Sequence, residues 1–156
     1  MLKKLLLVTV LFSCQYLMAQ DVRKIKGKDL INFTDSAKRP TIINIWATWC
    51  LPCIQELNYF EKIVNENKNI RLVLLSVDYA NDYSKIFTFL KVRNITAETY
   101  WLDEFNLAVL QTDFDKRFNG MIPATLMINN SKKYRSFHAG QLSEKKLRKE
   151  IDKLIN

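Results

Sequence analysis

The feature that most constrains the fold of this chain is a pair of cysteines at the junction of two segments with different apolar patterns. Residues 46–53 read WATWCLPC, so Cys50 and Cys53 are separated by two residues. The overlapping run IINIWA, at 42–47, is almost continuously apolar, which is typical of a strand buried on both faces. After the cysteines, apolar side chains recur every three to four residues, which predicts an amphipathic helix. They are Ile54, Leu57, Phe60 and Val64.

The rest of the chain continues the alternation of strands and helices. Residues 71–77, RLVLLSV, form a second apolar run that ends at Asp78. The order strand, helix, strand predicts a right-handed βαβ unit with two parallel strands. The further elements expected are a helix at 86–94, a short strand at 98–102, a helix at 105–114, a strand at 124–128, a turn at 129–131, a strand at 133–138 and a final helix capped by Ser143. The pattern predicts an α/β domain in which helices flank a sheet.

The N-terminal segment is predicted to be a signal peptide (1–19) that precedes a single domain at 20–156. It begins with two lysines, is uncharged from Leu5 onward and ends at the small Ala19. The uncharged stretch is shorter than the roughly 20 residues that a membrane-spanning helix needs. Two alternatives remain, namely a lipoprotein signal with the lipid on Cys14 and an uncleaved membrane anchor. Export would place the domain in the periplasm or another extracytoplasmic compartment, where disulfides persist.

The charge of the chain gives little indication of a partner. The net charge of +8 falls to +6 once the two lysines of the signal peptide are removed. The densest group of charges, SEKKLRKEIDK at 143–153, mixes signs at helical spacing, which is typical of a solvated helix face. A basic balance of this kind does not by itself indicate nucleic acid, and no nucleic-acid partner is expected.

Metal binding and haem attachment are poor explanations of the cysteine pair. A structural zinc site needs four Cys or His ligands, but the chain after signal removal offers two cysteines and His138. A c-type haem needs a histidine directly after the second cysteine, where this chain has Ile54. We therefore expect no metal and no organic cofactor. A purely structural disulfide across so short a loop would contribute only about 2 kcal/mol, a weak reason for two cysteines in a domain with a large core.

Thiol chemistry explains the pair better. Pro52 is tolerated in the first turn of a helix because no intrahelical bond needs its N–H, so Cys50 is expected at the helix N-terminus. Unpaired backbone N–H groups and the helix dipole stabilise an anion there. Such positions lower the pKa of a thiol from about 8.5 to between about 3.5 and 7.5. Cys53, one turn further into the helix, would be the shielded resolving thiol.

Residues 38–57, KRPTIINIWATWCLPCIQEL, resemble the active-site segment of exported thioredoxin-like thiol–disulfide oxidoreductases of the TlpA and ResA-like type. Pro123, preceded by isoleucine and followed by ATLMIN, resembles the cis-proline segment of that family, and Gly140 and Leu142 before the last helix also match. The resemblance covers nearly all of the chain after the signal peptide. It implies a thioredoxin fold, a central mixed sheet flanked by helices, with 78–122 as the family's insertion between the second parallel strand and the cis-proline strand.

The resemblance implies roles for the residues around the cysteines. Cys50 matches the attacking cysteine and Cys53 the resolving one. Glu56, three residues later on the same helix face, matches the family's active-site glutamate and would take up the proton of the resolving thiol. The alternative for Glu56 is an ordinary surface residue of the amphipathic helix. Asn44 falls where cytosolic thioredoxin has a buried aspartate and where this exported family commonly has asparagine.

Three further residues match the substrate-binding part of the family. Trp49 matches the aromatic residue that flanks the site. Pro123 matches the cis-proline beside the two sulfurs, and the backbone of Ile122 would then pair with an extended substrate peptide. A trans proline at a strand edge is the alternative. The chain departs from the family's pattern at Leu51 between the cysteines, at Gly120 three positions before the proline, and at Ala124 after it. The departure at Leu51 leaves the reduction potential open, whereas those at Gly120 and Ala124 concern the detail of the peptide groove and not the fold.

The resemblance implies an extracytoplasmic thiol–disulfide oxidoreductase that reduces protein disulfides. It would act as a monomer and receive electrons from a membrane-bound or soluble thiol donor. Two alternatives use the same fold, namely a thiol oxidant and a module that binds partner proteins along the Pro123 groove while its disulfide stays inert. Of the remaining candidates, His138 is expected to be a strand residue that faces solvent, and Trp101 is expected to belong to the core.

Overall fold

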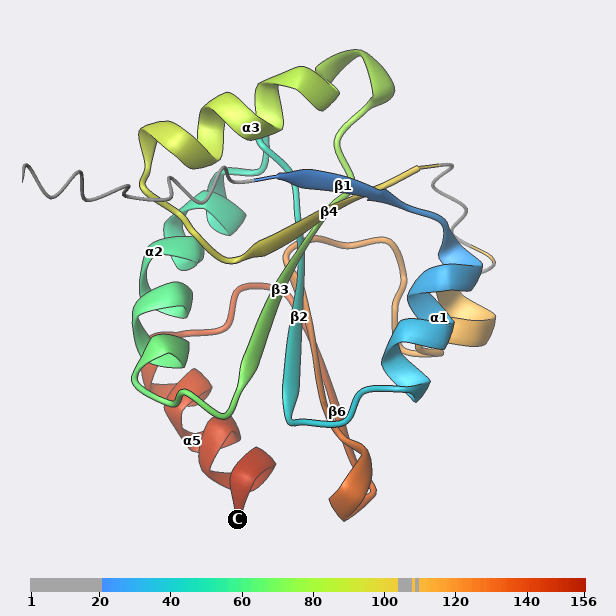
Figure 1. Ribbon diagram of the computed structural model, residues 1–156, viewed down its shortest axis with the longest axis vertical. Coiled ribbons are helices and arrows are strands. Elements are labelled where there is room, and N and C mark those ends of the chain that lie inside the picture. The colour runs from blue at the N-terminus through green and yellow to red at the C-terminus, as the bar shows by residue number, and fades with distance from the viewer. Residues whose placement is uncertain (1–20, 104–107, 109) are drawn as a thin grey trace, which may run out of the picture.

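The computed structural model describes residues 21–103, 108 and 110–156 and is built around a six-stranded sheet (Figure 1). The strands are β1 (Val22–Ile25), β2 (Thr41–Trp46), β3 (Arg71–Ser76), β4 (Glu98–Leu102), β5 (Ala124–Asn129) and β6 (Tyr134–Ala139). They lie in the order β1-β4-β3-β2-β5-β6. The first four in that order run parallel, whereas β5 is antiparallel to β2 and β6 is antiparallel to β5. The sheet is therefore mixed, as expected.

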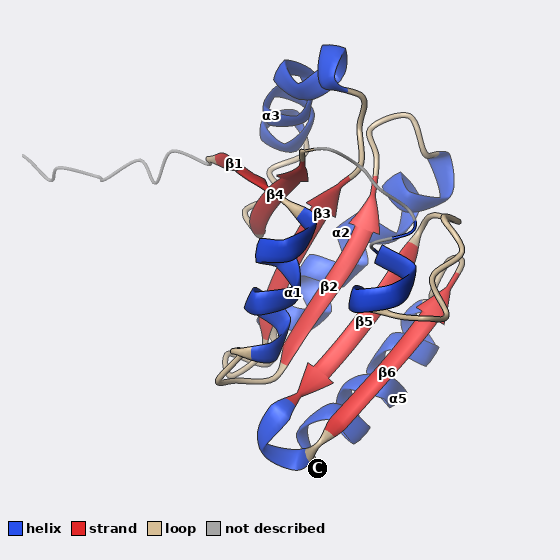
Figure 2. Cartoon of the chain, turned by 90° about the vertical axis from the view of Figure 1, so that its right-hand side faces the viewer, coloured by secondary structure: helices blue, strands red, loops and turns tan. Residues whose placement is uncertain are grey.

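Helices cover both faces of the sheet (Figure 2). They are α1 (Gly27–Asp35), α2 (Leu51–Asn65), α3 (Tyr83–Val92) and α5 (Glu144–Ile155), with short helical turns η1 (Ala80–Asp82), η2 (Leu110–Phe114) and η3 (Asn130–Lys132). The buried side chains of α2, α3 and α5 belong to one apolar cluster, and those of α1 and η2 belong to another. The sheet separates these two clusters, which is the layer arrangement of a thioredoxin-like fold.

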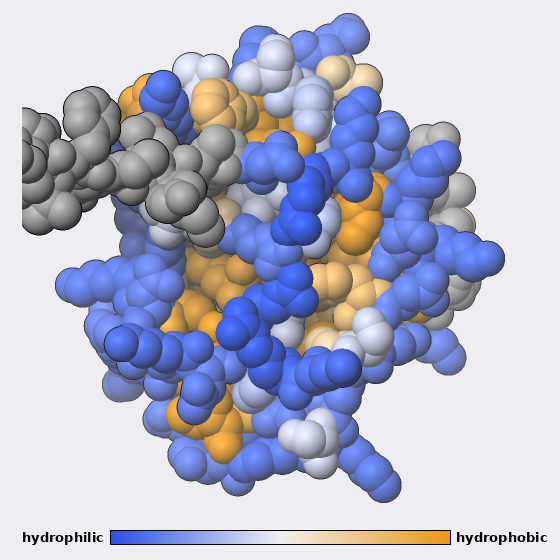
Figure 3. All heavy atoms as spheres, viewed as in Figure 1, coloured by the Kyte–Doolittle hydropathy of each residue, from blue (hydrophilic) through white to orange (hydrophobic). Residues whose placement is uncertain are grey.

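The central strand β2 is buried on both faces, as its apolar sequence predicts. Ile42 and Trp46 pack on the side of α2, whereas Ile43 and Ile45 pack on the side of α1. None of the four side chains retains exposed surface. In the face seen in Figure 3, hydrophilic side chains cover most of the exterior and hydrophobic ones show through near its centre. The strand that leads into the cysteines is thus fixed from both sides, which gives the site a rigid base.

Most of the predicted elements are confirmed, with differences of a few residues. β2, α2 and β3 form the parallel βαβ unit, and Ser143 caps α5 by accepting from the Lys146 N–H. The predicted turn between the last two strands is the helical turn η3, followed by Lys133 in a left-handed conformation. Of the helix predicted at 105–114, the structure describes Ala108, which is helical, and the turn η2, in which Leu110 and Phe114 are buried.

Some predictions fall on residues that the structure does not describe. The predicted signal peptide (1–19) and Cys14 lie outside the described residues, as do Phe105 and Leu107 of the predicted middle helix. Within the described part of the chain, none of the helices is both long enough and apolar enough to cross a membrane.

Candidate active site

The end of β2 and the start of α2 place the two cysteines at the N-terminus of a helix. Cys50 and Cys53 form a disulfide with their Cα atoms 5.3 Å apart. Cys50 is the N-cap residue of α2, its Sγ accepts from the Cys53 N–H over 3.3 Å, and Pro52 stands in the first turn. Cys50 is 5% exposed, whereas Cys53 has no exposed surface. Of the two sulfur-bearing residues, only Cys50 therefore reaches the surface.

A buried aspartate fixes the segment that leads into the cysteines. Asp78, just beyond the end of β3, accepts from the Thr48 N–H at 3.0 and 3.1 Å and from the Thr48 hydroxyl at 2.5 Å. The Ser76 hydroxyl donates to the same carboxylate over 2.7 Å. Since Thr48 lies two residues before Cys50, Asp78 holds the approach to the disulfide from the neighbouring parallel strand.

Apolar side chains surround the exposed side of the disulfide. Trp49 and Tyr79 stack with ring centroids 6.0 Å apart. Both rings line a hollow of about 400 Å³ that also includes Trp101 and Ile122. Trp49, Leu51, Tyr79 and Met121 are each more than half exposed. Exposed apolar side chains in such number are typical of an interaction surface. Trp101, predicted to be a core residue, is buried and also forms part of this hollow.

The peptide bond between Ile122 and Pro123 is cis, as the sequence predicts. The carbonyl oxygen of Pro123 accepts from the Gly140 N–H over 2.8 Å. Gly140 adopts a φ of +86°, a conformation that a residue without a side chain tolerates best. Within the described part of the chain, the backbone of Ile122 forms no hydrogen bond with another backbone group.

The carboxyl group of Glu56 is buried beneath the disulfide-bearing turn of α2, which contradicts the alternative of a surface residue. Its Oε1 accepts from Asn44 Nδ2 over 2.7 Å and its Oε2 accepts from the Leu142 N–H over 2.9 Å. Glu56 has no exposed surface. Burial raises the pKa of Glu56 to about 7, although the hydrogen bonds from Leu142 and Asn44 lower it. A carboxyl group of this kind can both accept and return a proton near neutral pH.

The position of His138 differs from the sequence prediction. It lies on β6, as expected, but it is half-buried and lines a hollow of about 220 Å³ between β6 and α5. The reason is the register of the two strands. His138 pairs with Thr125, and the Thr125 hydroxyl accepts from Asn44 on the inner face of the sheet, so His138 lies on that face too. Its Nδ1 accepts from Lys146 over 3.0 Å. Burial, and next the charge of Lys146, lower the pKa of His138 below its usual value.

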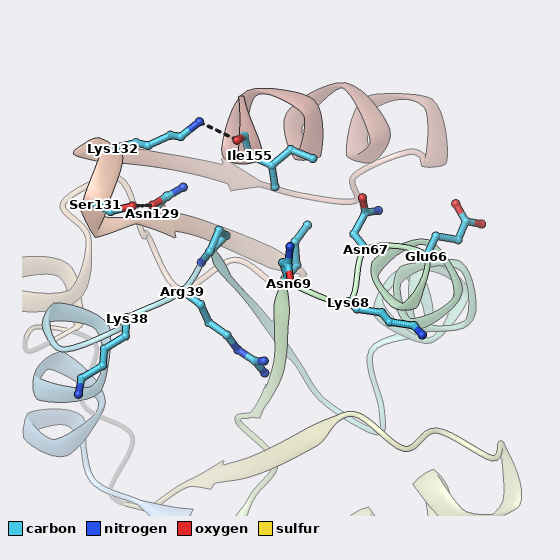
Figure 4. Close-up of a pocket in the computed structure, with 12 residues that line it drawn as sticks. Lys38, Arg39, Glu66, Asn67, Lys68, Asn69, Asn129, Ser131, Lys132 and Ile155 are labelled. Atoms are coloured by element: carbon cyan, nitrogen blue, oxygen red, sulfur yellow. Dashed lines mark hydrogen bonds between the residues drawn. The ribbon is translucent and has the colours of Figure 1, made fainter.

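A larger hollow of about 670 Å³ lies at the opposite end of the sheet, where β2 and β3 begin. Lys38, Arg39 and Lys68 line it, and Figure 4 shows Lys38 and Lys68 pointing to opposite sides. Lys132 lies in the same lining and donates to the carbonyl oxygen of Ile155. The positive side chains do not converge, and we assign no ligand to this hollow. Among residues 21–103, 108 and 110–156, no cluster of three Cys, His, Asp or Glu side chains could hold a metal ion.

The structure thus brings together Trp49, Cys50, Cys53 and Glu56 at the start of α2 and directly before it, and it adds residues that the sequence did not indicate. Asp78 was available as a signal, because a polar residue directly after a buried parallel strand faces the loops at that end of the sheet. Tyr79 carried no such signal. Leu142 contributes only its backbone N–H to Glu56, so its side chain could not reveal the contact.

Comparison with known proteins gives relatives of one kind. No protein-family model matches the chain. The chain is 25% identical over 119 residues to the thioredoxin-like protein YneN of Bacillus subtilis, covering 76% of this chain and 66% of that protein. It is 30% identical over 113 residues to the thiol:disulfide interchange protein DsbE of Yersinia pestis, covering 72% of this chain and 55% of that protein. The chain therefore matches between about half and two thirds of the length of these relatives.

Solved structures show the same fold. A thioredoxin-related protein from Neisseria meningitidis serogroup B superposes with a TM-score of 0.63 at 21% identity, covering 76% of this chain and 87% of that one. A secreted disulfide oxidoreductase of Mycobacterium tuberculosis superposes with a TM-score of 0.58 at 16% identity, covering 74% and 82% of the two chains. With its cysteine pair at the start of α2 and its cis-proline, the chain has a thioredoxin-like fold, and the proteins that it is similar to include thiol:disulfide interchange proteins.

Proposed function

We propose that the protein is an extracytoplasmic thiol–disulfide oxidoreductase that reduces disulfides in other proteins. One observation carries the proposal, namely a Cys50–Cys53 disulfide at a helix N-terminus, partly exposed at Cys50 and backed by a buried acid. A merely structural disulfide would need neither the helix N-terminus nor the exposed apolar side chains beside it. The relatives named as thiol:disulfide interchange proteins support the same activity.

The reaction begins with the reduced dithiol. The Cys50 thiolate attacks one sulfur of the substrate disulfide, forms a mixed disulfide and releases one substrate thiolate. Cys53 then attacks the Cys50 sulfur, restores the Cys50–Cys53 disulfide and releases the second substrate thiolate. Two electrons pass from the dithiol to the substrate. The roles follow from access, since Cys50 reaches the surface and Cys53 does not.

Glu56 is the proton acceptor for the second step. Cys53 must lose its proton before it attacks, because the thiolate is the nucleophile. A carboxyl group with a pKa of about 7 is ionised often enough to accept that proton and acidic enough to return it to a departing thiolate or to water. Glu56 and Cys53 are three residues apart on α2 and therefore lie on the same face of the helix.

The substrate is a protein segment in extended conformation. The exposed apolar side chains around Cys50 provide contact area, and the unpaired backbone groups of Ile122 can add a strand-like pairing beside Pro123. The hollow of about 400 Å³ beside Trp49 has room for a large apolar side chain.

Location and direction complete the proposal. Residues 1–19 act as the signal for export, with lipid attachment at Cys14 as the alternative. A membrane-bound or soluble thiol donor would restore the dithiol, and the protein would act as a monomer. The secreted relative from Mycobacterium tuberculosis supports a position outside the cytoplasm.

Reduction of insulin by the purified protein with dithiothreitol as donor tests the activity. We expect faster precipitation of insulin with the wild type than with dithiothreitol alone, and no such gain with Cys50→Ser. An inert wild type would support the binding-module alternative. Equilibration with glutathione then gives the direction, because a tenfold change in this two-electron equilibrium corresponds to about 30 mV. A potential well above that of glutathione would assign an oxidant instead.

A further inference from the structure

The segment between β6 and α5 is hydrogen-bonded to α2 through both backbone groups of one residue, Leu142. The Leu142 N–H donates to Glu56 Oε2 over 2.9 Å, and the Leu142 carbonyl oxygen accepts from the Tyr59 hydroxyl over 2.6 Å. Glu56 and Tyr59 are three residues apart and share one face of α2. The side chain of Leu142 is fully buried in the apolar cluster beneath that face.

We propose that Tyr59 is a positioning residue for the resolving step, because its hydroxyl fixes Leu142 where the Leu142 N–H supports the Glu56 carboxylate. The inference rests on the proposed function insofar as it concerns catalysis. The contact between Tyr59 and Leu142 is observed independently of any activity. The hydroxyl of Tyr59 donates to Leu142, so Tyr59 acts through Leu142 and Glu56.

The physical argument concerns the few groups that stabilise a buried carboxylate. Glu56 has two hydrogen-bond donors in the described structure, Asn44 and the backbone of Leu142. Asn44 is held by its strand, since β2 is paired on both sides. Leu142 lies in a connection outside the sheet, where the Tyr59 hydroxyl is the side-chain contact that fixes its carbonyl group. Loss of that contact leaves the N–H of Leu142 free to move away from Glu56.

The surrounding charges do not replace this contact. The titratable groups around Glu56 and Leu142 include Tyr59 on α2, His138 on β6, and Glu144, Lys146 and Glu150 on α5, whereas the disulfide-bonded cysteines do not titrate. β2 and β5 contribute Asn44 and Thr125, which do not titrate. The hydrogen bond from Leu142 lowers the pKa of Glu56 against the larger effect of burial. Weakening that bond therefore raises the pKa.

The test is a ¹³C NMR titration of the Glu56 carboxyl group in the oxidised protein, which needs no substrate. We expect Tyr59→Phe to raise the pKa of Glu56 by about half a unit, the size expected for one weakened hydrogen bond to a charged group. Tyr134→Phe is the matched control, since its hydroxyl contacts Glu150 rather than Leu142. The control should leave the pKa unchanged. Equal titrations of wild type and Tyr59→Phe would overturn the proposal.

A second measurement connects the contact to the reaction. The pH midpoint of mixed-disulfide release should move upward in Tyr59→Phe by the same amount as the pKa, whereas the rate of the first attack by Cys50 stays unchanged. A uniform loss of rate at all pH values would show a structural role only and would overturn the positioning role. If the wild type reduces no disulfide while the Glu56 pKa still shifts, the proposed function fails and the contact stands.

Hydrogen exchange covers the case in which Tyr59→Phe does not fold. In the wild type, the Leu142 amide should exchange more slowly when Glu56 is ionised than when it is protonated, because a charged acceptor holds the N–H more strongly. The change in protection should follow the titration of Glu56. If the exchange rate of the Leu142 amide did not change as Glu56 titrates, apart from the intrinsic effect of pH, the proposed link between the two groups would be contradicted.

Discussion

The side-chain amide of Asn44 donates to the carboxyl group of Glu56 over 2.7 Å, and both residues lack exposed surface. The interior beside the disulfide therefore contains one titrating acid and one neutral amide. An amide at position 44 stabilises the charged form of Glu56 without competing for its proton. This arrangement places behind the disulfide an acid whose pKa, about 7, lies in the range useful for proton transfer.

Glu56 makes the stability of the oxidised protein depend on pH. Its pKa is raised from 4.5 to about 7 in the folded state, so between these values the unfolded chain loses the proton and the folded chain keeps it. The folded state therefore loses stability as pH rises through this window. The free energy of unfolding of Glu56→Gln, relative to that of wild type, should rise by up to about 3 kcal/mol as pH increases from 4.5 to 7. Above pH 7 the difference should stay constant. Urea unfolding at several pH values measures this, and parallel stability curves for the two proteins would contradict it.

Glu98 should give the opposite dependence. Burial raises the pKa of Glu98, but the hydrogen bonds from Arg71 and Tyr100 lower it by more than burial raises it. The resulting pKa is about 2. The stability it contributes is present above the unfolded pKa of about 4.5 and is lost as pH falls toward 2. Because the group is partly solvated, we expect Glu98→Gln to cost only about 1–2 kcal/mol at pH 7. Glu66→Gln, which removes an exposed pair with Arg148, is the control and should change urea unfolding little. An equal cost at pH 2 and pH 7 would refute the assignment.

The difference in access between the sulfurs predicts different trapping by the two cysteine variants. Cys53→Ser should accumulate mixed disulfides with partner proteins, because Cys50 still attacks and nothing resolves the product. Cys50→Ser should accumulate none, since Cys53 is fully buried. Non-reducing gels of the two variants, with and without dithiothreitol, show the adducts. Equal trapping by both variants would reverse or erase the assigned roles.

Asp78 should matter for stability through the loop it holds. Asp78→Ala removes the acceptor of the Thr48 N–H, the Thr48 hydroxyl and the Ser76 hydroxyl. Leaving these donors unpaired should cost about 2–4 kcal/mol, measured by urea unfolding. Thr48→Val, which keeps the backbone N–H bond and the shape of the side chain, should cost less. A larger cost for Thr48→Val than for Asp78→Ala would show that the carboxylate is not the main restraint.

The order of the central elements was predictable because their residues carry strong local patterns. β2 and β3 are continuous apolar runs, and α2 has one apolar face, so burial alone specifies them. β1 and α1 carried no comparable signal. β1 has only Val22 and Ile25 buried, and α1 has a single large apolar residue, Leu30, fully buried. β1 is stabilised by pairing with β4, and α1 is stabilised by packing on one face of the sheet. Both contacts join residues that are far apart in the sequence, so no local pattern indicates them.

The candidate site divides in the same way. Cys50, Cys53 and Pro52 show their placement through spacing, and Pro123 through its resemblance to a known segment. The partial burial of His138 could not be predicted, because the register of a hairpin decides which face a residue takes, and a shift by one residue reverses it. The burial of Glu56 depends on α5 and on a backbone group of Leu142, 86 positions away. The sequence of α2 alone therefore does not indicate that Glu56 is buried.

The hydrogen bonds from Gly140 to Pro123 and from Leu142 to Glu56 lie two residues apart on one connection. One fixes the segment next to the cis-proline and the other fixes the acid behind the disulfide. Between them stands Gln141, which is exposed. The side chain of Gln141 makes an exposed contact with Gln55 over 3.5 Å. In variation among homologues or in engineering, the identity of residue 141 is therefore less constrained than the number of residues between the two hydrogen bonds. A single insertion or deletion there would separate the groove from its proton acceptor even if every named side chain were retained.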